Sequence, residues 1–540
     1  MKKRIISLLL ILVGFTGSAC ADYDVEVLKA NLKQHSNQMK SFSGIDYDYV
    51  HINNTEEASK EIEKKEKIKD PQIDALICVN KNGKISHEVT LVHPEDAEFT
   101  ALFEGEEQIL LIYHQEKGSQ DIIFVNRIDK RDVAPKWNPE ILMLVKAKKR
   151  DYLQYDISPD KSHFVVGEAS RKSKKDNYML HITTLDRIGK IVYSQISYLQ
   201  YIYKKVYFLD VVVNNDGITY CSLFNYDTKS KYSNVHVYAL NGKDCKAYSE
   251  NIGVSWYFDY PFCSATTTSG GFVLGGVSSE KQSVLFYLPS PDASLQKKVD
   301  SFSDYAKSAV ESSFGKMHES SSPVSDGKWM ETHGLYQLSD GSYVVISETW
   351  GKAHRETQKK TTTSYQDKNG KTHTTTTYTT ERDNYVHWSG DIVAAFYDKD
   401  LNLIGYKVCN KFQKRYTGGF SSRYDNGMFR KQSYSILNCL SHKSFVDGDE
   451  LKLLYYINDG QEYWNICTMK HDKNIVNKVV EYSKCDFEIR DVNFAYKDYW
   501  VVHLYGEKKK RLNDLSILLL HAKDTESEQT DVTEESPDLF

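Results

Sequence analysis

The chain has 540 residues, which is enough for a large core or for more than one domain. Its formal net charge is −5 and its sequence pI is near 6.4, so no overall positive field attracts nucleic acid. Tyrosine is abundant, with 38 residues, whereas there are only 10 prolines. Tyr and Thr fit a pleated, half-buried surface, so this composition indicates an all-β protein.

Residues 1–21 have the order of a bacterial secretory signal peptide. Lys2, Lys3 and Arg4 form a positive start, and an apolar run from Ile5 to Val13 follows. The run is shorter than the roughly 20 apolar residues that a membrane-spanning helix needs. We therefore expect the chain after this segment to be exported.

Two processing routes remain open at the end of this segment. Ala19-Cys20-Ala21 is an A-x-A site, and cleavage after Ala21 would release a periplasmic or extracellular protein. Alternatively, Gly17-Ser18-Ala19-Cys20 resembles a lipobox, although Gly17 stands where a larger apolar residue is usual. In that case Cys20 would carry a lipid, and the protein would be an outer-membrane lipoprotein.

Residues 22–72 differ from the rest of the chain. Val25, Leu28 and Leu32 have helical spacing, which predicts a short amphipathic helix over residues 24–40. The run from Glu56 to Lys69 is highly charged and is typical of a solvated helix or a linker. We expect this segment to precede the main domain.

Residues 73–522 are predicted to form a β-propeller. Short apolar runs alternate with Asn-Gly and Asp-Gly turns, which are strong hairpin signals. When repeats are aligned on their first turn, the spacing is 54 to 56 residues over the first anchors and 50 over the last pair. A period near 50 with about four strands per unit is typical of propeller blades. These anchors predict about seven blades, with eight as the alternative. The anchor residues are Gly105, Asp160, Asp216, Gly270, Asp340, Gly448 and Asp498.

One of these turns carries a family resemblance. Ser158-Pro159-Asp160-Lys161 resembles the S-P-D-G turn of TolB-like and WD40-like propeller blades, with Lys161 in place of the usual Gly. The resemblance implies the propeller fold and no particular function, because such blades occur in proteins of many functions.

The ends of the repeat region suggest how the ring closes. The last predicted strand, Leu515–Leu520, has no partner after it. We expect the N-terminal strands within Ile73–Val89 to complete this last blade and remove its open edge. Residues 289–328 are an insertion with a helix expected at 295–311, and residues 523–540 form an acidic tail that we expect to be disordered.

A Thr-rich segment, residues 353–386, mirrors itself around Asn369-Gly370. It predicts a long hairpin that projects into solvent, with Lys368 opposite Lys371, and a disordered loop is the alternative. This alignment sets Ser364 opposite Thr375 and Thr361 opposite Tyr378. A projecting hairpin is a natural partner-contact element, and its candidate binding residues are Trp350, Tyr365, Tyr378 and Trp388. For the two tryptophans, which should lie close together, core packing is favoured over a ligand platform.

The sequence contains no recognisable catalytic, metal-binding or cofactor-binding motif, so no metal or cofactor is expected. Glu168 and Glu348 each lie eight residues after a blade anchor and are the only catalytic candidates, as a carboxylate pair acting on a glycoside. Solvated carboxylates at strand ends are the favoured interpretation.

Three functions follow. The leading hypothesis is a non-catalytic binding or scaffold protein of the bacterial cell envelope, with a protein or glycan partner. The alternatives are a propeller-type glycan hydrolase and a lipid-anchored structural subunit. No nucleic-acid partner is expected, and membrane contact is expected only through a lipid on Cys20.

Overall fold

The structure is a computed structural model. It describes residues 9–10, 23–29, 39–57, 68, 70–81, 85–118, 120–146, 149–171, 176–199, 206–226, 233–252, 262–277, 281–319, 328–417, 442–457, 463–480, 487–496, 499–506 and 515–522. These residues are nearly all in β-strands, together with one α-helix. No helix among them has both the length and the apolar content that crossing a membrane requires.

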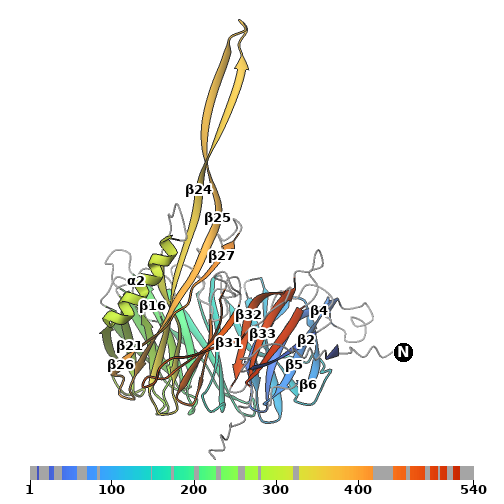
Figure 1. Ribbon diagram of the computed structural model, residues 1–540. Coiled ribbons are helices and arrows are strands. Elements are labelled where there is room, and N and C mark those ends of the chain that lie inside the picture. Colours follow the sequence, from blue (N-terminus) through green and yellow to red (C-terminus); the bar gives the residue numbers. More distant parts are fainter. Residues whose placement is uncertain are drawn as a thin grey trace, which may run out of the picture.

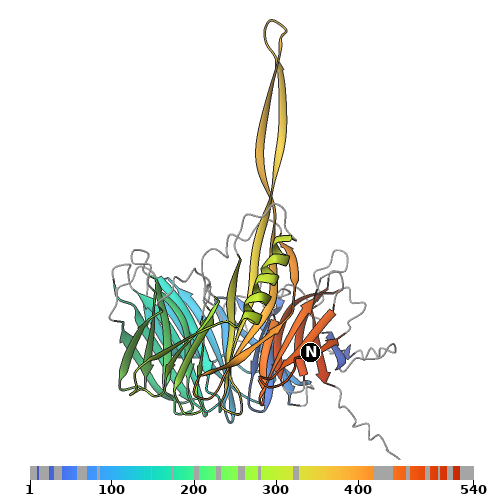
Figure 2. The same ribbon diagram turned by 60° about the vertical axis from the view of Figure 1, so that its left-hand side comes forward.

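The strands form eight antiparallel sheets, which are the blades of a β-propeller (Figures 1 and 2). Blades are numbered here by the chain order of their first strands. Blades 1 to 4 consist of β3 (Met39–Ser43), β4 (Tyr47–Glu57), β5 (Pro71–Asn80) and β6 (Ile85–Pro94); β7 (Ala97–Glu104), β8 (Gln108–Lys117), β9 (Gln120–Asp129) and β10 (Glu140–Lys146); β11 (Lys149–Ile157), β12 (His163–Arg171), β13 (Met179–Asp186) and β14 (Ile191–Tyr198); and β15 (Val206–Val213), β16 (Thr219–Tyr226), β17 (Ser233–Leu240) and β18 (Cys245–Asn251).

The remaining blades follow the same order, with additions in blades 6 and 8. Blades 5 to 8 consist of β19 (Phe262–Thr266), β20 (Phe272–Val277), β21 (Gln282–Leu288) and β22 (Gln296–Ser301); β23 (Lys328–Gln337), β24 (Tyr343–Gln366), β25 (Thr372–Tyr397), β26 (Leu403–Cys409) and β27 (Gln413–Thr417); β28 (His442–Asp447), β29 (Glu450–Ile457), β30 (Tyr463–Met469) and β31 (Val476–Val480); and β32 (Phe487–Tyr496), β33 (Tyr499–Gly506) and β34 (Leu515–Ala522) with β2 (Tyr23–Lys29) and β1 (Leu9–Leu10).

The ring closes through the start of the chain. The first strands of blades 1 and 8, β3 and β32, contact each other, as do the first strands of most other neighbouring blades. Blade 8 is completed by β2, which pairs antiparallel with β34 from Tyr23 opposite Ala522 to Lys29 opposite Ser516. An N-terminal strand therefore completes the last blade, but the expected segment was wrong, because β5 and β6 over Ile73–Val89 are the outer half of blade 1.

The N-terminal region is not the helical segment that we expected over residues 22–72. The described part of the predicted 24–40 helix is strand β2, and residues 39–57 supply the two inner strands of blade 1. Helical spacing over so few residues does not separate a helix from a short strand, and here the partner strand β34 decides. No anchor predicted blade 1, whose first turn lies at Gly44 between β3 and β4. It raises the number of blades to eight, the alternative to seven.

The turn that resembles TolB-like and WD40-like blades has the expected geometry. Lys161 lies in the left-handed region with φ of 60°, and its N–H donates to Ser158 O at 2.8 Å. The corresponding residue of the next blade is Gly217, with φ of 77°. Lys161 therefore occupies a backbone conformation that glycine adopts without steric cost.

Apolar side chains fill the space between neighbouring blades. Phe103 of blade 2 stacks on Phe164 of blade 3, with ring centroids 5.2 Å apart. The described cysteines are free thiols, and most of them are buried in this core as small apolar side chains. Two predicted segments lie outside the described residues. They are the signal peptide, residues 1–21 apart from Leu9–Leu10, and the acidic tail, residues 523–540.

The insertion between blades 5 and 6 contains helix α2 (Asp304–Glu319), which begins later than predicted. Residues 296–301 pair instead with β21 as the outer strand of blade 5. Ser303 caps the helix, since its hydroxyl accepts a hydrogen bond from the Ala306 N–H at 3.3 Å. The helix packs on β24 and β25, beside the point where these strands leave the ring (Figure 2).

Candidate functional site

The most distinctive feature of the molecule is the hairpin formed by β24 and β25, which rises out of the ring (Figures 1 and 2). The two strands remain paired from Tyr343 opposite Tyr397 to Gln366 opposite Thr372. Beyond the blade, the described side chains of residues 359–379 are exposed, except for two of intermediate exposure near the tip. At about 3.4 Å per residue, the arm after Gly351 extends roughly 50 Å.

The tip of the hairpin is a three-residue loop. Gly370 donates its N–H to Asp367 O at 3.0 Å, and Asp367 N–H donates to Lys371 O at 3.0 Å. The Asp367 carboxylate also accepts the N–H groups of Asn369 and Lys371, each at 2.9 Å. Gly370 has φ of 76°, as the glycine after a type I turn in such a loop requires.

This loop shifts the register by one residue from the prediction. Ser364 lies opposite Thr374 rather than Thr375, and Thr361 lies opposite Thr377 rather than Tyr378. The prediction assumed a two-residue turn and did not account for the Asp367 side chain, which favours the longer loop. Because the side-chain period of a strand is two, a shift of one residue changes which side chains share a face.

The two hairpin tyrosines, Tyr365 and Tyr378, lie on opposite faces of the ribbon. Tyr365 is 62% exposed and stacks on His373 directly opposite, with centroids 5.2 Å apart. Tyr378 is 61% exposed and lies opposite Lys360. Both tyrosines are therefore accessible to a partner, but a flat partner on one face would meet only one of them.

The two predicted tryptophans lie at the hairpin root and are buried. Trp350 lies opposite Ser389, and Trp388 lies opposite Gly351 on the same pair of strands. Since neighbouring residues of a strand point to opposite faces, the two indoles are on different sides of the sheet. They are 3% and 1% exposed, so both indoles pack inside the protein.

Glu348 is the centre of a buried polar cluster on the same face as Trp350. Its Oε2 atom lies 2.9 Å from His442 Nδ1 and 3.4 Å from His333 Nε2. Its Oε1 atom is bound by the Lys411 ammonium and the Ser389 hydroxyl. These residues join β23, β24, β25 and the start of β28, so the cluster connects blades 6 and 7 beneath the hairpin.

The side chains of the cluster are shielded from solvent. The side chains of Glu348, Lys411 and His442 are fully buried, and that of His333 is 5% exposed. Burial lowers the pKa of Lys411 well below its ordinary value. Burial likewise raises the pKa of Asp391, whose carboxylate accepts the Lys411 backbone N–H at 2.9 Å.

The structure does not assemble the carboxylate pair considered for glycoside hydrolysis. Glu168 and Glu348 occupy second strands of blades 3 and 6, and blades 4 and 5 stand between them on the shorter way round the ring. Both are buried, at 3% and 0% exposure, so they are also not solvated strand-end carboxylates. A glycosidase needs its two carboxyl groups within about 10 Å across an open site. Glu348 has no exposed surface, and its carboxylate binds Lys411, Ser389 and His442 instead.

Two further polar clusters belong to the ring itself. In blade 1, Asp74 Oδ2 accepts hydrogen bonds from His51 Nε2 at 2.8 Å and His93 Nε2 at 2.9 Å, and all three residues are buried. Burial lowers the pKa of His51, while the pKa of Asp74 is lowered by its two histidine partners against the opposing effect of burial. The cluster ties three strands of one blade together.

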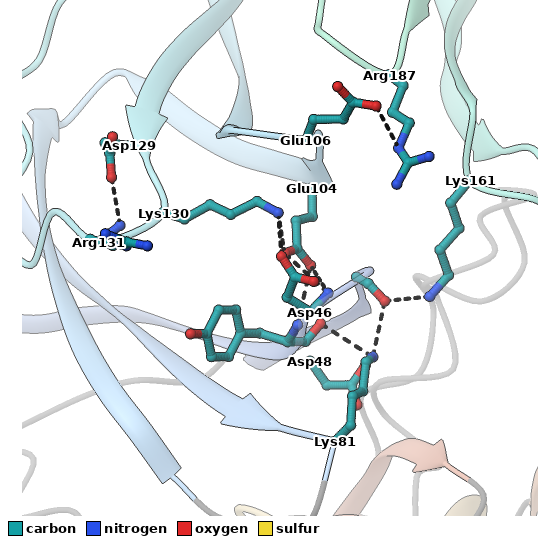
Figure 3. A network of polar contacts seen from close by, with 12 residues as sticks. Asp46, Asp48, Lys81, Glu104, Glu106, Asp129, Lys130, Arg131, Lys161 and Arg187 are labelled. Carbon is teal, nitrogen blue, oxygen red and sulfur yellow. Dashed lines mark hydrogen bonds and ion pairs between the residues drawn. The ribbon is translucent and has the colours of Figure 1, made fainter.

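The second cluster links the turns of blades 1, 2 and 3 (Figure 3). Buried Glu104 accepts the backbone N–H of Asp46 at 3.1 Å and the ammonium of Lys130 at 2.9 Å. Lys81 and Lys161 both donate to the carbonyl of Gly44. Burial alone would lower the pKa of Lys130, but its hydrogen bonds to Asp46 and Glu104 raise it. These charges bind one another and act as an internal clamp.

Two groups of three side chains among the described residues could hold a metal ion. One is His333, Glu348 and His442, and the other is His114, Glu116 and Asp121 at the end of the β8–β9 hairpin. No sequence motif predicts the first group, because its members come from three strands with no motif spacing. His333 is the extra residue of a bulge between Thr332 and Gly334, which the alternating pattern does not reveal.

Comparison with known proteins leaves the chain without a family. No family model matches the sequence, and no curated protein matches it either. Solved structures match over much of the chain at low identity. The WD40 domain of SCAP from fission yeast has 8% identity over 93% of this chain and 95% of its own, with a TM-score of 0.33, and the polysaccharide lyase Uly1 has 10% identity over 91% of each chain, with a TM-score of 0.36. Prolyl oligopeptidase B from Galerina marginata has 10% identity over 88% of this chain and 56% of its own, with a TM-score of 0.37.

These matches have TM-scores below 0.5 and carry no argument about function. The fold assignment rests on the strand order, which gives eight sheets closed into a ring. The chain is a β-propeller with an N-terminal closing strand and a long projecting hairpin.

Proposed function

We propose that this protein is an exported, non-catalytic β-propeller of the bacterial cell envelope that captures a partner protein through its hairpin. The observation that carries the proposal is the exposure of a ribbon that stays paired to its tip. Over its described residues 359–379 the ribbon covers no apolar core beyond the blade, so selection for stability alone does not account for it.

The hairpin has two means of recognition. Its outer edges beyond Tyr385 have no strand partner within the described chain, so their backbone N–H and C=O groups are available to an extended peptide. Tyr365 and Tyr378 add one exposed aromatic ring to each face. Edge pairing favours a protein partner; a glycan partner would use the tyrosines and the threonine hydroxyls instead.

The position of the closing strand bears on the export hypothesis. Cleavage after Ala21 would leave a mature chain that begins one residue before β2, and it would remove β1. A lipid on Cys20 would instead lie three residues before β2, which would hold the propeller close to the membrane. Radiolabelled lipid incorporation that is lost in Cys20→Ala supports the anchored form, and no incorporation into wild type excludes it.

The central experiment shortens the hairpin. Residues 355–384 are replaced by Asn-Gly, because His354 and Tyr385 are directly paired and a two-residue turn can join them. Wild type and the shortened protein are used as bait in envelope extracts, and captured proteins are identified by mass spectrometry. We expect the same unfolding midpoint for both baits, and loss of the wild-type partner from the shortened bait.

Point variants locate the contact. Tyr365→Ser and Tyr378→Ser each remove one exposed ring, on opposite faces, and Thr362→Ser is the matched control on the Tyr378 face. One tyrosine variant should weaken capture more than the other if the partner covers one face. Undiminished capture by the shortened bait contradicts the proposal, and capture that survives deglycosylation of the extract excludes the glycan partner.

A further inference from the structure

We propose that the root of the hairpin is a binding site for a divalent transition-metal ion, Zn²⁺ by its donor chemistry, formed by His333, Glu348 and His442. The three ligand atoms, His333 Nε2, Glu348 Oε2 and His442 Nδ1, all lie within 4.8 Å of one another. They come from β23, β24 and β28, so a bound ion would connect blade 6 to blade 7 directly below the projecting hairpin.

The spacing of these atoms suits a tetrahedral ion. Ligands at about 2.0 Å from zinc are roughly 3.3 Å apart at tetrahedral angles. The carboxylate oxygen of Glu348 lies 2.9 Å from His442 Nδ1 and 3.4 Å from His333 Nε2. Small side-chain adjustments, without a shift of the strands, would bring all three atoms to bonding distance.

Neighbouring groups orient the carboxylate. Lys411 and Ser389 both bind Glu348 Oε1, so Oε2 is left facing the two imidazoles. Second-shell contacts of this kind fix the orientation of a ligand in metal sites.

The state of His333 also fits a ligand. Trp350 Nε1–H donates to His333 Nε2 at 3.1 Å, so this nitrogen carries a lone pair and its proton is on Nδ1. A metal ion would take the lone pair and displace the indole contact. At His442, metal binding would replace the proton between Nδ1 and the carboxylate, and that proton would be released to solvent.

A second carboxylate lies beside His333. Glu331 lies directly opposite Glu348 across β23 and β24, and its Oε2 atom is 3.7 Å from His333 Nε2. Two carboxylates in directly opposite positions repel each other, and a divalent cation between them relieves that repulsion. Two imidazoles with carboxylates favour zinc over calcium or magnesium, which prefer all-oxygen sites.

The test uses the whole mature chain, stripped with a chelator and dialysed. Isothermal titration with Zn²⁺ should show one site per chain, together with a higher unfolding temperature. Co²⁺ should give the intense visible absorption of a four-coordinate site. His333→Gln should weaken Zn²⁺ binding by at least about tenfold, while the double variant His114→Gln, Asp121→Asn controls for the other group of three and should bind as wild type does.

X-ray absorption at the zinc edge of the loaded wild type keeps the test decisive if the buried variants fold poorly. The spectrum should show scattering from two imidazole ligands and no sulfur. Lack of saturable Zn²⁺ binding by wild type overturns the proposal. So does a spectrum without imidazole scattering, or a loss of binding in the His114 and Asp121 variant that His333→Gln does not share.

Discussion

Gly390 lies where helix α2 packs against the hairpin root, and its replacement by alanine tests that packing. A Cβ at this position would lie well inside contact distance of Ser313 Oγ and Thr349 Oγ1, and 2.9 Å from Met317 Cε. The two hydroxyls are hydrogen-bonded to each other at 2.8 Å, and Ser313 Oγ also accepts the Asp391 N–H at 3.1 Å. All of these atoms are buried, so the added methyl group must push the helix outward.

The cost follows from two effects. Overpacking a well-packed interior by one methyl group costs about 1–3 kcal/mol. Weakening the two buried hydrogen bonds adds about 1 kcal/mol for each bond. We therefore expect Gly390→Ala to lower the free energy of unfolding by about 3–5 kcal/mol.

Gly315 supplies the matched control on the same helix. A Cβ there would meet nothing within 4 Å, and the residue lies in the interior of α2. Gly315→Ala should raise the free energy of unfolding by about 0.5–1 kcal/mol, because alanine loses less backbone entropy than glycine in a helix. The same chemical change should thus have opposite signs at two positions.

Urea unfolding followed by circular dichroism measures both variants, and hydrogen exchange of β24 and β25 localises the effect. Gly390→Ala should speed amide exchange at the hairpin root, and Gly315→Ala should not. A Gly390→Ala protein within about 0.5 kcal/mol of wild type, with unchanged exchange, would show that α2 does not brace the hairpin as described.

Two other predictions concern the ring. Burial lowers the pKa of His236 from 6.5 to about 4, so its stabilising contribution is present above pH 6.5 and is lost as pH falls toward 4. Acidification from pH 7 to pH 5 should lower the free energy of unfolding of wild type, and of the exposed control His471→Gln. In His236→Gln this loss should be smaller by about 2 kcal/mol, because the variant has no imidazole to protonate at this site. Deleting residues 22–29 should abolish the single cooperative unfolding of the ring, because among the described strands β34 would then pair only with β33. Retention of wild-type stability would contradict closure by β2.

The blade pattern was readable from the sequence because each blade repeats a local turn. Anchors such as Asp216 and Asp340 recur near the same period, and their following glycines have positive φ. The N-terminal strand was not readable, since its partner β34 lies at the other end of the chain and the short apolar pattern of residues 23–29 fits two structures. The predicted hairpin register was wrong by one residue because the Asp367 side chain favours a three-residue loop over the two-residue turn that the prediction assumed.

The polar cluster at the hairpin root was the least predictable part. Glu348 was found through its position after a turn, but its partners His333, Lys411 and His442 lie in other strands or loops. No linear spacing joins them. Only the contact between blades 6 and 7 brings these side chains together.

The pairing of β2 with β34 also constrains the order in which the molecule can fold. Strand β2 is synthesised early and its partner β34 is synthesised near the end of the chain. Blade 8 therefore cannot form on a nascent chain that lacks β34. Contacts of such long sequence separation slow folding, and until they form both strands have unpaired edges. The propeller is therefore expected to reach its native ring in one late step, and a chain interrupted before residue 515 would keep an open last blade however well its other blades are made.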